Sequence, residues 1–166
     1  MAGKDFKINC INQGEDVLCM RKILQIPELN ENDIDKVSKV IDMIANNVDK
    51  DCRNELNELQ NLTGKLHSVE EFAEYWGWTD LDSLARITLM PEPPCVSDLD
   101  RTELETIIGI IKKAFISGED DKGEYYAELL HKSMSVPDVM DYIMSGQDVK
   151  TIADKILSAE NNVIFL

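Results

Sequence analysis

The side chains best suited to catalysis or metal binding are few, and their spacing does not bring them together. His67 and His131 are the two histidines of the 166-residue chain. The cysteines, which form no Cys-x-x-Cys pair, are Cys10, Cys19, Cys52 and Cys95. Neither histidine stands at zinc-ligand spacing from a cysteine. We therefore expect no metal site, and we interpret the cysteines as reduced and mostly buried.

Patterns that bind phosphate or activate water are also missing from the sequence. The chain contains no GxxxxGK[ST], GxGxxG or HExxH pattern. His131 fits a solvated or capping position at a helix edge better than the role of a base. The adjacent carboxylates Asp120 and Asp121 are typical of a solvated helix end. Because an enzyme needs convergent groups with shifted pKa values, we predict no catalytic residues, no cofactor and no enzymatic activity.

The charge balance is strongly acidic, with 17 Lys and Arg against 32 Asp and Glu and a net charge of −15. Such a chain repels phosphate backbones and anionic lipid, so we expect neither a nucleic-acid partner nor a membrane partner. A basic protein would be attracted, and its encounter rate raised by factors of roughly 10–10³. Solubility alone is the competing explanation of the charge. Since no segment resembles a membrane span or signal peptide, we expect a cytoplasmic protein.

The elements that must position any site show helical periodicity almost throughout, which predicts an all-α fold. Asn32 is the expected cap of a helix whose apolar stripe is Ile34, Val37, Ile41 and Ile44, with Val40 at its edge. A second stripe, ending at Gly64, consists of Leu56, Leu59 and Leu62. Near the N-terminus, residues 15–24 could form a helix, while "KINCI" at 7–11 could form a short strand.

A third helical segment is predicted after residue 67. Ser68 and Glu71 form a capping-box pattern, and the stripe that follows is Val69, Phe72, Ala73 and Trp76. Thr79 is the expected cap of the next helix. We interpret Tyr75, Trp76 and Trp78 as local core and lid. The alternative is that they stack on a ligand, as in a small-molecule-binding or enzymatic domain with a pocket between the two halves.

The segment "MPEPPCVSD" divides the sequence, because Pro91, Pro93 and Pro94 cannot donate backbone hydrogen bonds. We predict an N-terminal helical half over 1–90, a Pro-rich joint over 91–97 and a C-terminal four-helix bundle over 98–166. A rigid elbow within one continuous domain remains the alternative. The first C-terminal helix has Asp100 and Glu103 as its cap, and its stripe is Leu104, Ile107, Ile108, Ile111 and Phe115.

Three further helices are predicted: "YYAELLHKSM", the short "PDVMDYIM" between Pro137 and Gly146, and "DVKTIADKILSA". In the first of these, Tyr126, Leu129 and Leu130 face inward. Tyr125 lies about 100° from Tyr126 on the helix, so we expect it to be partly exposed beside Glu124 and Glu128. An exposed tyrosine among carboxylates would suit an interface anchor.

The order of these C-terminal pieces resembles the bacteriocin immunity proteins, including those that neutralise colicin-type nucleases. In that family, the short third helix carries the pattern P-D-G-x-D-L-I-Y-Y-P, and the corresponding stretch here is "PDVMDYIMSG". Pro137, Asp138, Asp141 and Ile143 match the pattern, whereas Tyr142 takes the place of its Leu. Met144 and Ser145 stand where the family has its two toxin-docking tyrosines. The resemblance covers roughly residues 98–163 and leaves residues 1–90 unexplained.

This resemblance implies an immunity protein that binds and neutralises a cognate bacterial toxin, for example a nuclease, in the producing cell. The toxin would be basic, and no cofactor would be needed. The alternative is a non-catalytic helical adaptor for another basic protein, and the sequence does not indicate the oligomeric state. The predicted partner-binding residues are Glu119, Asp120, Asp121, Glu124, Tyr125, Glu128, Asp138, Asp141, Tyr142 and Met144.

Overall fold

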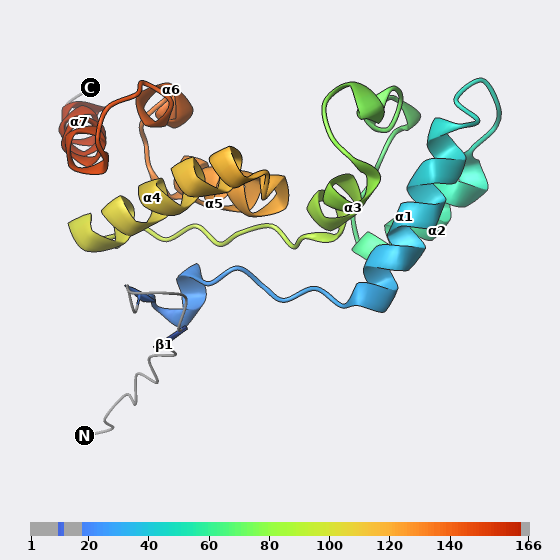
Figure 1. Cartoon of the computed structure of the whole chain (residues 1–166), viewed down its shortest axis with the longest axis horizontal. Coiled ribbons are helices and arrows are strands. Elements are labelled where there is room, and N and C mark those ends of the chain that lie inside the picture. The colour runs from blue at the N-terminus through green and yellow to red at the C-terminus, as the bar shows by residue number, and fades with distance from the viewer. Residues whose placement is uncertain (1–9, 12–17, 164–166) are drawn as a thin grey trace. The chain divides into compact units, whose positions relative to one another are not determined.

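The computed structural model describes residues 10–11 and 18–163, and its regular structure is almost entirely helical (Figure 1). The predicted all-α class is therefore confirmed. Near the N-terminus, β1 (Cys10–Ile11) and β2 (Leu18–Cys19) form a two-residue antiparallel ladder, followed by the 3₁₀ helix η1 (Lys22–Leu24). The helix alternative over 15–24 is thus wrong for the described residues 18–24. Residues 7–9 of the predicted strand lie outside the described part.

Internal contacts divide the chain into two compact units. Unit 1 contains the residues up to Ile26, then Pro93–Lys113 and Tyr126 onward. Unit 2 contains Pro27–Glu92 and Ala114–Tyr125. One change of unit falls at Pro93, inside the segment predicted as a joint. The units do not follow chain order, because the N-terminal segment groups with the C-terminal helices.

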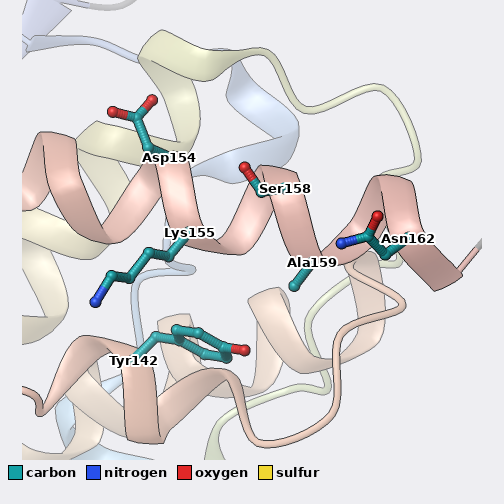
Figure 2. Close-up of a pocket in the computed structure, with 6 residues that line it drawn as sticks. All are labelled: Tyr142, Asp154, Lys155, Ser158, Ala159 and Asn162. Atoms are coloured by element: carbon teal, nitrogen blue, oxygen red, sulfur yellow. The ribbon is translucent and has the colours of Figure 1, made fainter.

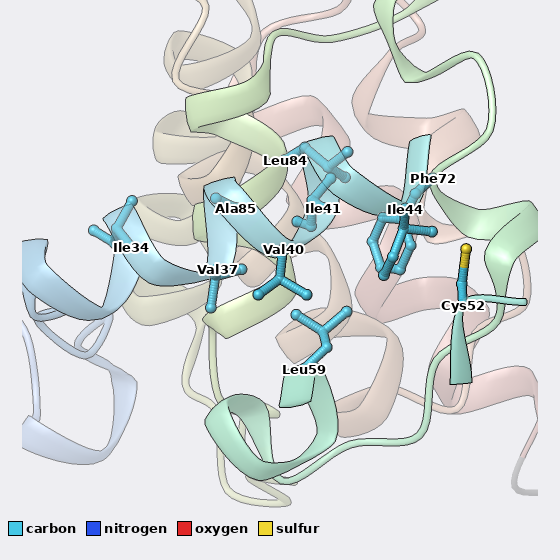
Figure 3. Packing of buried hydrophobic residues seen from close by; sticks show 10 residues of the cluster. All are labelled: Ile34, Val37, Val40, Ile41, Ile44, Cys52, Leu59, Phe72, Leu84 and Ala85. Carbon is cyan, nitrogen blue, oxygen red and sulfur yellow. The ribbon is translucent and has the colours of Figure 1, made fainter. Parts of the chain in front are cut away.

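Unit 2 is built around α1 (Glu31–Ala45), which packs against both α2 (Arg53–Thr63) and α3 (Leu81–Leu89). Figure 3 shows the apolar stripe of α1 surrounded by side chains of the neighbouring elements. The core residues are Ile34, Val37, Val40, Ile41, Ile44, Cys52, Leu59, Phe72, Leu84 and Ala85. The predicted stripe of this helix is confirmed. Its predicted cap is wrong, because the Asn30 side chain accepts from the backbone N–H of Asn32.

The connection between α2 and α3 differs from the predicted helix. Gly64 ends α2 with a φ of 72°, and the Ser68–Glu71 capping box is present as predicted. Only the 3₁₀ turns η2 (Val69–Glu71) and η3 (Tyr75–Gly77) follow, separated by Glu74 at a φ of 57°. This left-handed residue rotates the chain away from the face of Phe72.

The change of chain direction at Glu74 explains why two tryptophans lie outside the core. Trp76 is 64% exposed and Trp78 is 61% exposed, so the expectation that they form local core is wrong. The expected cap at Thr79 is wrong as well. Asp80 caps α3 instead, accepting from the backbone N–H and the hydroxyl of Ser83 at 2.9 and 2.7 Å.

The four predicted C-terminal helices are present as α4 (Arg101–Ser117), α5 (Asp120–Ser133), α6 (Val139–Ile143) and α7 (Val149–Val163). Asp100 and Glu103 cap α4 reciprocally, as predicted. The α4 and α5 helices each pass through both units. Side chains of unit 1 with 0% exposure are Leu24, Ile107, Ile108, Ile111, Leu129, Leu130, Ile143, Ile152, Ala153 and Ile156.

Ionic and polar contacts join the segments of unit 1. Arg101 at the start of α4 lies 2.6 Å from Asp154 on α7. Lys112 donates from Nζ to the carbonyl of Gln147, just before α7. The hydroxyl of Tyr126 accepts from the backbone N–H of Ile26 at 3.2 Å. The first two contacts join α4 to α7 and to the residues just before it, and the third joins α5 to the N-terminal segment.

Candidate partner-binding surface

The predicted partner-binding residues divide between the two units. Glu119, Asp120, Asp121, Glu124 and Tyr125 belong to unit 2, and Glu128, Asp138, Asp141, Tyr142 and Met144 belong to unit 1. The boundary between the units falls inside α5, between Tyr125 and Tyr126. Each group is considered within its own unit.

In unit 2, the carboxylates around the start of α5 are already engaged in helix formation. Gly118 makes the turn after α4 with a φ of 76°. Glu119 accepts from the Ser117 hydroxyl at 3.0 Å and lies 3.9 Å from Lys122 Nζ. Asp120 and Asp121 occupy the first turn, where the helix dipole favours negative charge. Part of the acidity predicted to face a partner thus has a local structural role.

The expectation that Tyr125 is partly exposed is wrong. Its side chain is 5% exposed, and that of Tyr126 is 3% exposed. The start of α5 is buried over a wide arc, since Gly123 is buried too and faces the ring of Phe115 at the end of α4. Burial raises the pKa of the Tyr125 phenol. Tyr125 is therefore part of the packing and is not available as a surface anchor.

In unit 1, α6 presents three predicted residues while its other face is fixed in the core. Val139 and Ile143, four residues apart, are buried at 3% and 0% exposure. The same short helix leaves Asp141 exposed and Tyr142 half-buried, and Met144 at its end is 63% exposed. Asp138 starts the helix with a left-handed φ of 57°. The buried pair holds the exposed residues in a defined arrangement.

A shallow groove of about 370 Å³ lies between α6 and α7. The groove residues are Tyr142, Asp154, Lys155, Ser158, Ala159 and Asn162. Figure 2 shows the Tyr142 ring on the side of α6 that faces α7, with Lys155 and Ala159 on the side of α7 nearest to it. Asp154 is already paired with Arg101. An aromatic ring, a hydroxyl, an amide and an ammonium could together receive one protruding polar side chain.

Sequence analysis identified Tyr142 but not the α7 wall of the groove. The available signal was the spacing of residues 154, 155, 158, 159 and 162, which follows the face of α7 opposite its apolar stripe. Ile152, Ala153 and Ile156 form that stripe, and all three are buried. A polar helix face is usually only a solvated face. Nothing in the sequence marks it as one wall of a groove.

The histidines and cysteines, the side chains best suited to catalysis or metal binding, lie in separate surroundings. His67 lies 3.1 Å from Thr63 Oγ1 through Nε2 and 2.9 Å from Glu71 Oε2 through Nδ1, and its ring packs on Phe72. His131 is exposed in the last turn of α5. Cys52 is buried and Cys95 is exposed, and both are free. Among the described residues, no group of three or more His, Cys, Asp or Glu side chains is placed to bind a metal ion.

Across the described segments, no helix has the length and apolar character needed to span a membrane. No protein-family model, curated protein or solved structure matches this chain.

Proposed function

We propose that this chain is a non-catalytic protein-binding module that recognises a basic protein through the α6 surface of unit 1. The α6 surface comprises Asp138, Asp141, Tyr142 and Met144 together with the groove residues of α7. The supporting observation is that α6 is fixed by Val139 and Ile143, while Met144 at its end is 63% exposed and Tyr142 of the same helix lines the groove. Because the backbone of α6 is already fixed by its buried residues, little backbone entropy is lost when a partner covers this surface.

The α6 residues of this surface contribute to binding in two ways. Met144 and the Tyr142 ring supply the apolar contact that slows dissociation, because buried anchors carry most of the affinity of an interface. Asp138 and Asp141 supply negative charge that attracts a basic partner and speeds association. The net charge of −15 reinforces this attraction at low ionic strength.

The resemblance to bacteriocin immunity proteins supports a more specific form of the proposal. In this form the partner is a cognate bacterial toxin, such as a nuclease, which the chain neutralises by binding it in the cytoplasm of the producing cell. The Pro-Asp-led helix is the element that carries the resemblance, and it is also the helix that displays Met144. Met144 would replace an aromatic anchor of the family, so the complementary pocket on this toxin would accept an unbranched thioether side chain.

The experiment pairs the purified chain with the proteins encoded by genes beside its own and measures association and dissociation rates over a range of ionic strength. We expect one basic partner whose association slows as salt rises. Met144→Ala should accelerate dissociation by about tenfold, the equivalent of about 1.4 kcal/mol. Met43→Ala is the matched control, because Met43 is 50% exposed on α1 of unit 2 and should leave both rates unchanged.

Growth protection separates the immunity role from that of a general adaptor. If the partner arrests growth when expressed alone, co-expression of the wild-type chain should restore growth, and the Met144→Ala variant should restore it less well. A partner that is bound but harmless would support the adaptor alternative. Equal dissociation rates for Met144→Ala and the wild type would refute the role of the α6 surface.

A further inference from the structure

The loop between α2 and α3 in unit 2 displays unusually large apolar side chains to solvent. Leu66 is 82% exposed, Trp76 64% and Trp78 61%. Trp76 and Trp78 are the two tryptophans of the whole chain. We name the segment Gly64–Asp80 the tryptophan loop (green in Figure 1). Exposed tryptophans concentrated in one loop are typical of binding surfaces.

Hydrogen bonds hold the tryptophan loop in a fixed shape. The backbone N–H groups of Gly77 and Trp78 donate to the carbonyls of Glu74 and Tyr75, both at 3.0 Å. The Tyr75 ring meets the edge of the Trp76 ring at a centroid distance of 5.5 Å. Phe72, at 1% exposure, anchors the loop in the core of unit 2. The aromatic rings are therefore presented before any partner arrives, which reduces the entropy lost on binding.

The charge around these rings has one sign. Glu70, Glu71, Glu74 and Asp80 are exposed in the same segment. The sequence contains neither Lys nor Arg from residue 66 to residue 85. Glu71 also contacts His67, and both oxygens of Asp80 accept from Ser83, so the carboxylates most open to a partner are those of Glu70 and Glu74. Such a surface repels phosphate, which argues against nucleic acid stacking on the tryptophans.

We propose that the tryptophan loop binds an arginine-rich segment of a protein. Guanidinium planes stack on indole faces through cation–π attraction, and their remaining N–H groups pair with carboxylates. The loop supplies both partners, with Trp76 and Trp78 in the same segment as the exposed Glu70 and Glu74. Lysine would form the ionic contacts but would stack less well, because its charge is compact and strongly hydrated. This inference concerns a different unit from the α6 surface and does not depend on the proposed function.

Peptide binding to the loop can be followed by the fluorescence of its two tryptophans. Titrating the full-length chain with a blocked Gly-Arg repeat peptide should produce a saturable change in tryptophan emission. A Gly-Lys peptide of equal length and charge should bind several-fold more weakly, and a Gly-Glu peptide should leave the emission unchanged. Raised ionic strength should weaken the Gly-Arg complex without abolishing it, because stacking is screened less than the ionic contacts.

Two pairs of variants test the contributions of charge and stacking. Glu70→Gln with Glu74→Gln should weaken binding of the Gly-Arg peptide several-fold. Asp49→Asn with Glu58→Gln changes the net charge equally at exposed positions of unit 2 outside the loop, and should have a much smaller effect. Trp76→Leu with Trp78→Leu, followed by calorimetry, should weaken binding about tenfold although apolar area is kept. Circular dichroism confirms that each variant is folded.

The proposal is overturned if the Gly-Arg and Gly-Lys peptides bind equally well, or if the double leucine variant binds like the wild type. Absence of a saturable response in the wild type would overturn it as well. Tighter binding of a Leu-rich peptide would show that the loop is a plain apolar surface. None of these results alters the rates measured for Met144→Ala, so failure of this inference and failure of the proposed function can be distinguished.

Discussion

Arg21 donates two hydrogen bonds to Glu103, one from Nε to Oε1 at 2.5 Å and one from Nη2 to Oε2 at 2.8 Å. The same guanidinium reaches both carboxylate oxygens of Asp98, at 3.0 and 3.2 Å. Glu103 in turn accepts from the backbone N–H of Asp100 and helps to cap α4. One arginine thus joins the N-terminal segment of unit 1 to the start of a helix 80 or so positions later in the chain.

Replacing Arg21 should therefore destabilise the protein. Arg21→Ala removes the partner of Glu103, whose side chain is only 14% exposed, and leaves that carboxylate without its cation. We expect the free energy of unfolding to fall by about 1.5–3 kcal/mol, measured by urea denaturation. Arg21→Lys should recover only part of this loss, because an ammonium cannot reproduce the planar fork.

The control for Arg21 is Arg53, which pairs with Asp51 two residues away and is 84% exposed. Arg53→Ala should change stability by less than about 0.5 kcal/mol. If the Arg21 and Arg53 variants lose equal stability, the pairing of Arg21 with Glu103 contributes no more than a surface ion pair.

The cap of α3 should give a measurable dependence on pH. Hydrogen bonds from Ser83 lower the pKa of Asp80 below its ordinary value of 3.8. Its ionised form therefore stabilises the folded state at pH values above 3.8, and this contribution is lost as the pH falls through the lowered pKa. Asp80→Asn keeps a capping oxygen but no charge. The unfolding free energies of wild type and variant should differ by about 0.3–1 kcal/mol at neutral pH and converge in acid.

Two glycine substitutions should have opposite effects on stability. Gly109 lies within α4, and a Cβ added there meets no atom within 4 Å. Gly109→Ala should raise the unfolding free energy by about 0.5–1 kcal/mol, since alanine is the better helix former. Gly64 has equal space but a φ of 72°, so Gly64→Ala should lower it by about 1 kcal/mol. Thermal unfolding of both variants checks the difference, and equal shifts would contradict it.

Titration of the phenols tests the burial of Tyr125. Because burial raises its pKa above the ordinary 10.0, the Tyr125 phenol should ionise later than a free phenol. Tyr125→Phe should remove this late step from the ultraviolet titration of the folded protein. The contribution of the neutral Tyr125 phenol to the free energy of unfolding is fully present below pH 10.0. It is lost as the pH rises through the raised pKa, because the unfolded chain releases this proton at a lower pH than the folded protein. A wild-type curve without the late step would contradict the burial.

Periodicity predicted the parts of this fold in which one helix face meets one core. The stripe from Ile34 to Ile44 and the reciprocal cap of Asp100 and Glu103 are both present. Each depends on residues within one or two helical turns of each other, and such local relationships can be read from a sequence.

The features that were not predicted depend on backbone conformations and tertiary contacts that the local sequence does not specify. Glu74 adopts a left-handed conformation without being glycine, which converts an apparent apolar stripe into two 3₁₀ turns and exposes Trp76. Tyr125 is 5% exposed although it lies outside the predicted apolar stripe of α5, and the tertiary packing that covers it is not encoded in the periodicity of that helix. The groove beside Tyr142 needs both α6 and α7 in place, so no single stretch of sequence encodes it.

The interleaving of the two units has a consequence for how the chain matures on the ribosome. Unit 2 has all of its residues once position 125 has been synthesised, whereas unit 1 awaits Ile152 and Ile156 of its final helix. Residues 18–26 emerge before any residue of unit 2 but belong to the unit that is completed after it. Since domains form largely in the order in which they are translated, this early segment must stay uncommitted, or be sheltered by a chaperone, until α7 has been synthesised.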